Sequence, residues 1–369
     1  MAAPEPEVND VAQSPRTGRL EQLPLRRIVL IALLVGVLLA VAYGSYKTLT
    51  LPDGRAYSLA AWRDFLVLGV SQGAVYALIA LGYTLVYGIL RMINFAHGEV
   101  FMAGAFGSYF FADAWKDSGF MDDQVWLSLL LLVFIAIAVS VTIAVLLERI
   151  AYRPLRGSPR LVPLITAIGA SLFLQNTFRG LFGSQTRGYP KPTALEGTWT
   201  ILGIPIQKVQ VIVLIVAAVA MVLLTLFVSR TKTGKSMRAA AEDQEIASLM
   251  GINVDRVIVT TFVIGGILAG IAGVLFALTF GNISFFMGFL PGITAFTAAV
   301  LGGIGSISGA AIGGFLIGVL QSVGPALLLT GVNVPSPFQL KDVVTFLVLI
   351  LVLIFRPGGI LGTGEAEKV

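Results

Sequence analysis

The stretch of sequence that decides the fold is residues 229–256, SRTKTGKSMRAAAEDQEIASLMGINVDR. It lies between two apolar runs, Val209–Val228 and Val257–Phe280, and each run is long enough for a membrane-spanning helix, which needs about 20 residues. Strong helix formers within Met237–Met250 predict a short helix outside the bilayer, which Gly251 can end in a left-handed cap. Two interpretations follow: a docking surface for a soluble partner protein, or a solvated connector between two spans.

The composition is that of a membrane protein. Hydrophobic residues make up 56% of the chain and charged residues 12%, with a mean hydropathy of +0.89, whereas a soluble domain carries about a quarter charged residues. The 41 glycines are consistent with closely packed helices in lipid. With no cysteine and a single histidine, we expect no catalytic residues and no metal site. The net charge of +5 indicates basic loops on the cytoplasmic side of the membrane and not nucleic-acid binding.

The N-terminal region divides into two parts. Residues 1–24 are rich in Ala, Pro, Glu and Asp and are expected to form a disordered cytoplasmic N-terminus. Residues 25–64 begin with a basic cluster before the apolar run Ile28–Tyr43. This pattern predicts an uncleaved first transmembrane helix, with its N-terminus in the cytoplasm, followed by an external loop from Leu49 to Asp64.

The rest of the chain contains further apolar segments. The predicted spans are Phe65–Leu90, Val125–Leu147, Leu164–Phe182, Val209–Val228, Val257–Phe280 and Val343–Phe355, with a shorter helix at Glu99–Ala112. Residues 293–329 are too long for one span and predict a short helix, a glycine-rich break and a second helix. The basic loop 148–160 and the stretch 229–256 fall on the same, cytoplasmic side, and the acidic segment 113–123 falls outside. The fold class is therefore all-α polytopic, with eight to ten transmembrane helices, some of them broken or short.

Two polar or glycine-rich breaks interrupt the apolar segments, at Arg91–Gly98 and Gly302–Gly309. In lipid, irregular backbone is tolerated only where it is buried in protein or lines a watery cavity. The breaks are therefore candidate walls of a transport pathway and hint at an internal repeat. The candidate pathway residues are Asn94, His97, Glu99, Gln175, Asn176, Gly302, Gly303 and Gly305.

Structural roles are the alternative for each of these residues. Asn94 and Glu99 could cap a short helix that begins near Gly98. Gln175 and Asn176 could supply hydrogen bonds between helices. The glycines could permit close packing or a kink.

Nucleotide binding by this chain is excluded by the sequence around Gly234-Lys235-Ser236. A phosphate-binding loop, G-x-x-x-x-G-K-[ST], requires a glycine where this chain has Ser229. The run also follows a membrane helix and not a buried strand.

A family resemblance enters with residues 69–106, GVSQGAVYALIALGYTLVYGILRMINFAHGEVFMAGAF. This run closely resembles the permeases of high-affinity branched-chain amino acid ABC importers, most of all those of LivH type, and its specific part is the run from Asn94 to Glu99. Residues 245–251, EIASLMG, are similar to the E-A-A-x-x-x-G signature with which such permeases dock on an ATPase, although Ile246 replaces the first alanine. The resemblance covers about residues 65–369 and leaves residues 1–60 outside it.

The resemblance implies a type II ABC importer permease-like domain at 65–358, with a coupling loop at 229–256 and a tail at 359–369. It implies coupling residues within that loop, namely Arg238, Glu242, Asp243, Glu245, Ala247 and Gly251. The implied partners are a LivM-type sister permease, two ATPase subunits that bind ATP and Mg, and an extracytoplasmic substrate-binding protein, all at a bacterial inner membrane. The implied substrates are leucine, isoleucine and valine, and the chain itself needs no cofactor.

Three alternatives remain at this point. A permease for urea or short amides is related to the same family. An ion-coupled secondary amino acid transporter would require carboxylates within the membrane, for which Glu99 is the one candidate. An integral membrane enzyme is disfavoured, because the chain has one histidine, no cysteine and no paired buried acids.

Overall fold

The computed structural model describes residues 22–52, 56–159, 161–201, 203–356 and 358–361, and the chain divides into two compact units. The smaller unit comprises residues 1–56 and 327–335. Its main element is α1 (Gln22–Leu49), which contains the predicted first span. In this unit the N–H of Gly331, in η5 (Thr330–Val332), donates a 2.9 Å hydrogen bond to Thr48 Oγ1. Disorder was predicted for residues 1–24, but residues 22–24 belong to α1, and residues 1–21 lie outside the described residues.

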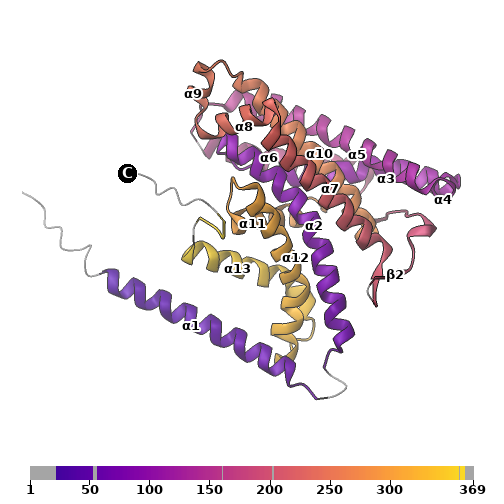
Figure 1. The fold of residues 1–369 in the computed structure, drawn as a ribbon, viewed down its shortest axis with the longest axis vertical. Helices are drawn as coiled ribbons and strands as arrows, with labels where there is room; N and C mark the ends of the chain where they lie inside the picture. Colours follow the sequence, from indigo (N-terminus) through magenta and orange to yellow (C-terminus); the bar gives the residue numbers. More distant parts are fainter. Residues whose placement is uncertain (1–21, 53–55, 160, 202, 357, 362–369) are drawn as a thin grey trace, which may run out of the picture. The chain divides into compact units, whose positions relative to one another are not determined.

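The larger unit comprises residues 57–326 and 336–369 and is helical (Figure 1). The helices that follow α1 along the chain are α2 (Leu59–Leu90), α3 (His97–Asp117), α4 (Phe120–Asp123), α5 (Val125–Leu147), α6 (Leu161–Phe182), α7 (Lys208–Arg230), α8 (Lys232–Glu242), α9 (Gln244–Leu249), α10 (Val254–Phe280), α11 (Phe289–Gly302), α12 (Ile307–Leu329) and α13 (Lys341–Phe355). Short π and 3-10 turns are η2 (Glu148–Tyr152), η3 (Arg153–Leu155), η4 (Thr193–Leu195) and η6 (Pro337–Leu340). Among the described residues, eight helical segments are long and apolar enough to cross a membrane. The prediction of an all-α polytopic membrane protein is confirmed.

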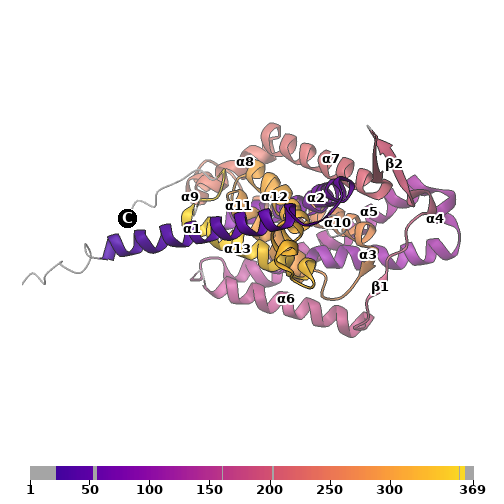
Figure 2. The same cartoon turned by 90° about the horizontal axis from the view of Figure 1, so that it is seen from below.

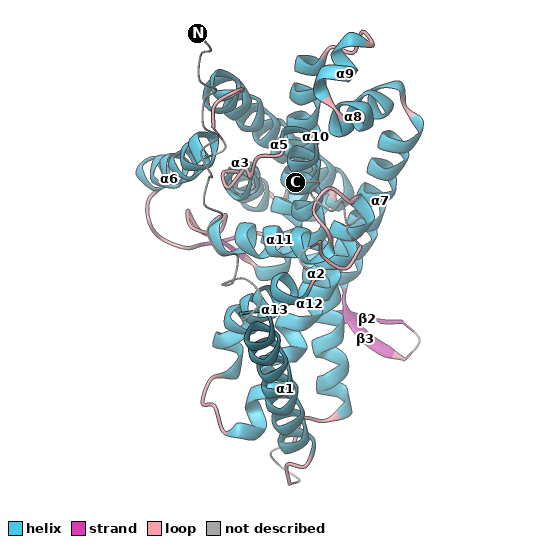
Figure 3. Ribbon diagram, turned by 90° about the vertical axis from the view of Figure 1, so that its left-hand side faces the viewer, coloured by secondary structure: helices cyan, strands magenta, loops and turns pink. Residues whose placement is uncertain are grey.

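Four short strands were not predicted from the sequence. β1 (Arg187–Gly188) pairs antiparallel with β4 (Asn282–Ile283). β2 (Thr198–Ile201) and β3 (Ile204–Gln207) form a hairpin (Figure 3). Within it Thr198 faces Gln207. The alternating β-branched and apolar residues on both sides of Gly203, which has φ +78, are the sequence signal for this hairpin.

Several predicted boundaries differ from the structure, and two of the differences change the expected loops. α2 begins six residues earlier than expected, because Ser58 caps it by accepting a 3.2 Å hydrogen bond from the N–H of Ala61. The loop expected to reach Asp64 is therefore shorter. α3 continues past Ala112 to Asp117, so part of the acidic segment expected to be a loop is helical.

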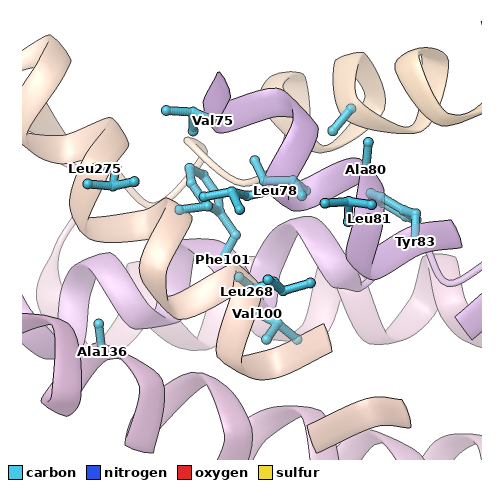
Figure 4. Close-up of a cluster of buried hydrophobic side chains, with 14 of the residues drawn as sticks. Val75, Leu78, Ala80, Leu81, Tyr83, Val100, Phe101, Ala136, Leu268 and Leu275 are labelled. Atoms are coloured by element: carbon cyan, nitrogen blue, oxygen red, sulfur yellow. The ribbon is translucent and has the colours of Figure 1, made fainter. Parts of the chain in front are cut away.

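The core of the larger unit is the packing of α2, α3, α5 and α10. Side chains from all four helices meet in it, including Leu78, Phe101, Ala136 and Leu268 (Figure 4). Glycines allow α10 to approach its neighbours, since a Cβ on Gly270 would lie 2.8 Å from the carbonyl oxygen of Ala136. Helices α6 and α7 lie on opposite flanks of this core (Figure 2).

The two ends of the larger unit are named here the loop end and the hairpin end, after the segments that each carries. The loop end carries residues 148–156 and 229–256, which an ion pair between Arg156 and Asp255 joins. The hairpin end carries residues 183–208 and 281–283, where the N–H of Tyr189 donates a 2.9 Å hydrogen bond to the Gly281 carbonyl. Asp122 of α4 belongs to the hairpin end, and its bond to the Lys116 ammonium is the main cause that lowers the pKa of its carboxyl. The count of predicted spans had also placed loops 148–160 and 229–256 on one side of the membrane.

The C-terminal segment returns to the bundle after α13. The N–H groups of Ile360 and Leu361 donate hydrogen bonds of 2.8 and 3.0 Å to the carbonyls of Leu301 and Gly302. These are the last two residues of α11, whose C-terminal carbonyls have no partner within the helix. The first residues of the predicted tail therefore cap α11, and residues 362–369 lie outside the described residues.

Candidate functional site

The break after α2 turns the chain back into the bundle. Arg91 has φ 51 and ends α2 in a left-handed cap, with its N–H bonded to the Tyr87 carbonyl at 2.7 Å. The imidazole of His97 then packs on α2 so closely that a Cβ on Gly82 would lie 2.2 Å from His97 Nε2. Gly82 precedes the end of α2 by about 12 Å at 1.5 Å per residue. Helix α3 therefore begins inside the bundle and not at the loop end.

Helix α11 begins at the same depth after entering from the hairpin end. The chain leaves α10 at Phe280, pairs through β4 and reaches Gly288, the residue before α11. A Cβ on Gly98 would lie 2.3 Å from the Gly288 carbonyl oxygen and 3.1 Å from Gly292 Cα. The N-terminal ends of α3 and α11 thus meet within the bundle, having approached from opposite ends.

The second predicted break, Gly302–Gly309, lies elsewhere. Gly302 packs so tightly on the next helix that a Cβ there would lie 1.9 Å from the Gly309 carbonyl oxygen. Gly303 ends α11, and Gly305 lines a cavity of about 540 Å³ at the loop end together with Arg91 and Arg238. The structure therefore separates Gly302, Gly303 and Gly305 from Glu99, and Gly302 has the close packing that was the structural alternative.

Glu99 lies where the two helices meet. Its side chain is 1% exposed. Its Oε1 accepts hydrogen bonds from Gln175 Nε2 at 2.8 Å and from Ser171 Oγ at 3.1 Å, both from α6. Among the described residues Glu99 Oε2 has no hydrogen-bond partner, and a Cβ on Gly288 would lie 2.5 Å from it. The carboxylate is thus close to the positive ends of two helix dipoles.

The other candidate residues differ in their surroundings. Asn94 does not cap α3, whose N-cap is Ala96 without a side-chain bond; its Oδ1 accepts a 2.8 Å hydrogen bond from the buried Tyr152 hydroxyl instead. The His97 ring meets the Tyr83 ring edge-on, with centroids 4.9 Å apart. Asn176 is exposed and donates to the Leu172 carbonyl on its own helix. The structure therefore brings Asn94, His97, Glu99 and Gln175 into one region and leaves Asn176 outside it.

We expect Tyr152→Phe to destabilise the break between α2 and α3. The substitution keeps the ring against Phe262 but leaves the buried Asn94 Oδ1 without its donor, which costs about 1–2 kcal/mol. The measurement is the thermal unfolding midpoint of the purified protein. Tyr46→Phe is the matched control, because Tyr46 is 66% exposed. An unchanged midpoint for Tyr152→Phe would show that the bond to Asn94 adds no stability.

A cavity of about 280 Å³ lies beside Glu99, between α6 and the start of α11. It is lined by Tyr83, Phe95, Ile168, Ser171, Leu172, Phe289 and Ile293. Ser171 is the lining residue that donates a hydrogen bond to the Glu99 carboxylate. This group of residues was not predicted, because its members come from four separate segments of the chain.

Comparison with known proteins identifies the family. Residues 65–353 match the family model described as "Branched-chain amino acid transport system / permease component". The chain belongs to this family of branched-chain amino acid transport permeases. The expectation drawn from residues 69–106 is thereby confirmed.

Curated relatives of the permease cover most of its length. It is 46% identical over 306 residues to the high-affinity branched-chain amino acid transport system permease protein LivH of Escherichia coli K12, a match that covers 82% of this chain and 96% of the relative. LivH of Salmonella typhimurium matches with the same identity and coverage. The permease protein BraD of Pseudomonas aeruginosa is 46% identical over 309 residues, which is 82% of this chain and 97% of the relative.

The loop end of the permease carries two helices where one was predicted. Asp243 separates α8 from α9, because its backbone is extended, with φ −152. Its Oδ1 caps α9 by accepting a 2.9 Å hydrogen bond from the N–H of Ile246. Gly251 ends the pair with φ +81, as predicted for a left-handed cap. The N–H of Ile252 donates a 3.1 Å hydrogen bond to the Ala247 carbonyl. This bond caps the C-terminal end of α9.

Helix α9 presents an apolar surface that sequence reasoning did not single out. Ile246, Leu249 and Met250 are 60%, 81% and 78% exposed, whereas Ala247 is buried against the protein. Glu245 is exposed in the first turn of the same helix. Three large apolar side chains on a polar, solvent-side helix indicate a surface that another protein covers.

Hydrogen bonds tie this helix pair to the end of α2. Gln244 Nε2 donates to the Ile89 carbonyl, and the Arg91 guanidinium reaches the Ala241 and Glu242 carbonyls at 3.5 and 3.4 Å. Arg238 donates to the Val228 carbonyl at the end of α7. A displacement of α8 and α9 would therefore pull on the residues that lead into the break before α3.

An ion cluster in which only Glu148 is fully buried connects the other loop of this end to α10. Arg156 pairs with the fully buried Glu148 and with Asp255 at the start of α10, and Arg153 approaches Asp255 at 3.5 Å. Tyr152, which bonds to Asn94, lies between these charges along the chain. The cluster therefore fixes the turn from which Tyr152 reaches the break.

Proposed function

We propose that this permease is the membrane subunit of an ATP-driven importer that moves leucine, isoleucine and valine from a binding protein into the cytoplasm. The family membership and the names of the relatives LivH and BraD support this substrate class. The permease forms the transport pathway, and separate ATPase subunits hydrolyse ATP. A tight site in the permease is not required if the binding protein selects the substrate.

The proposed partners are a LivM-type sister permease, two ATPase subunits that bind ATP and Mg, and an extracytoplasmic binding protein. The proposed location is a bacterial inner membrane, with the N-terminus and the loop end on the cytoplasmic side. The basic residues of loops 148–160 and 229–256 support this orientation.

The observation that carries the proposal is the exposed apolar surface of Ile246, Leu249 and Met250. We assign it as the contact with an ATPase subunit. The six coupling residues support it in different ways: Asp243 caps α9, Ala247 packs it inward and Gly251 ends it. Arg238 and Glu242 line the cavity between α8 and the end of α2, and Glu245 is free to contact the partner.

Coupling follows from these attachments. When ATP closes the two ATPase subunits, they displace α8 and α9. The bonds from Gln244 and Arg91 transmit that movement to the end of α2. The break at residues 91–96 then shifts the start of α3, which holds Glu99 where the path can open to one side or the other.

Uptake in proteoliposomes tests the proposed function. The purified permease is reconstituted with its partner subunits so that the ATPase subunits face the vesicle interior. Labelled leucine should accumulate only when ATP is inside the vesicle and the binding protein is outside. An ion-coupled transporter would instead depend on a sodium or proton gradient. Uptake that an ionophore abolishes, or that proceeds without ATP, would overturn the proposal.

A further inference from the structure

The cavity beside Glu99 has apolar walls and one hydroxyl group, that of Ser171, which bonds to the Glu99 carboxylate. Tyr83, Phe95, Phe289 and Ile293 give it aromatic and aliphatic surface. Pockets that bind small ligands are typically apolar with a few placed polar groups. This cavity has that composition, with the Ser171 hydroxyl in its wall.

Ser171 connects the cavity to the carboxylate. Its hydroxyl lines the cavity and donates to Glu99 Oε1 at 3.1 Å. The other carboxylate oxygen, Glu99 Oε2, lacks a hydrogen-bond partner among the described residues. A buried carboxylate with an unused oxygen is costly unless a donor or a positive charge reaches it.

The two helix starts explain why the carboxylate is held there. The N-terminal ends of α3 and α11 meet at Gly98 and Gly288, and both carry partial positive charge that stabilises an anion. Broken helices that meet at membrane depth are the places where transporters hold polar substrate groups. Glu99 therefore holds a carboxyl group beside an apolar cavity.

We infer that this cavity is a transient binding site for one amino acid on its way through the permease. The aliphatic side chain lies against Tyr83, Phe289 and Ile293. The ammonium group, with three N–H donors and a positive charge, displaces the Ser171 hydroxyl from Glu99 and pairs with the carboxylate. The inference rests on the proposed function and assigns the substrate contacts within it.

Two substitutions test the two halves of the site in the complete importer. Glu99→Gln keeps the shape and the acceptor oxygen but removes the charge, so leucine uptake should fall at least tenfold while ATP hydrolysis continues. Ile168→Phe reduces the space in the cavity, so uptake of leucine should fall about threefold or more relative to valine in a mixture of the two. Each rate is normalised to the amount of complex in the vesicle.

The matched control is Ile165→Phe. Ile165 lies on the same helix as Ile168, is 68% exposed and does not line the cavity. It should leave the leucine-to-valine ratio unchanged. If Glu99→Gln does not assemble, the ratio measured with Ile168→Phe still decides whether the cavity holds the side chain.

The outcomes separate this inference from the proposed function. Wild-type complex without ATP-dependent leucine uptake would overturn the proposed function. Wild-type uptake together with unchanged uptake by Glu99→Gln, or an unchanged ratio for Ile168→Phe, would overturn the binding site alone.

Discussion

Leu249→Asp should separate the permease from its ATPase subunits. Leu249 is 81% exposed and lies between Ile246 and Met250 on one apolar surface. A carboxylate placed there would have to be buried without a partner when the ATPase covers it. We expect the apparent affinity for the ATPase subunit to fall more than tenfold, which corresponds to about 1.4 kcal/mol or more.

Co-purification of the subunits from detergent-solubilised membranes measures this loss. Leu249→Met is the control, because it preserves an apolar side chain of similar volume and should retain the complex. Equal membrane levels of the two variants show that the permease itself still folds. If Leu249→Asp recovers as much ATPase as the wild-type permease does, α9 is a solvated connector and not a docking surface.

Gly98→Ala should destabilise the permease strongly. The added Cβ would lie 2.3 Å from the Gly288 carbonyl oxygen and 3.1 Å from Gly292 Cα, and both of these atoms belong to backbone that cannot rotate away. Forcing the starts of α3 and α11 apart costs about 3 kcal/mol, the upper part of the range for overpacked sites. The expected result is a lower thermal unfolding midpoint and a poor yield of folded protein.

Gly169→Ala is the matched control for this effect. Gly169 is in the interior of α6, and a Cβ there would meet nothing within 4 Å. Alanine also favours the helix by about 1 kcal/mol over glycine, so this variant should unfold at the same or a higher temperature. Equal midpoints for the two variants would contradict the close approach at Gly98.

The sequence predicted the spans well because hydropathy alone determines them. Val125–Leu147 was predicted at both ends, since Gln124 and Glu148 bound an uninterrupted apolar run. The division of residues 293–329 into two helices also followed from length, because one helix of that size exceeds the bilayer.

The connection between α10 and α11 was predicted only in part. Helix α10 ends at Phe280, as predicted, but α11 begins at Phe289 and not at Ile293. Phe285, Phe286 and Met287 make the residues before Phe289 as apolar as the helix that follows, so hydropathy does not mark where α11 begins.

The candidate site shows the same limit. Asn94, His97 and Glu99 were found because polar residues in an apolar region are conspicuous. The cavity beside them joins Phe95 to Phe289 and Ile293, nearly two hundred residues apart, and only the folded packing brings these together. Likewise, Ile246 is exposed because α9 packs on the protein through the side that carries Ala247. The spacing of apolar residues alone did not determine which side of α9 is buried.

The capping of α11 by Ile360 and Leu361 has a consequence for biosynthesis. Both residues follow α12 and α13 in the chain, so their N–H groups can reach Leu301 and Gly302 only after these two helices have been synthesised. The C-terminal carbonyls of α11 therefore lack these donors while α12 and α13 are being added.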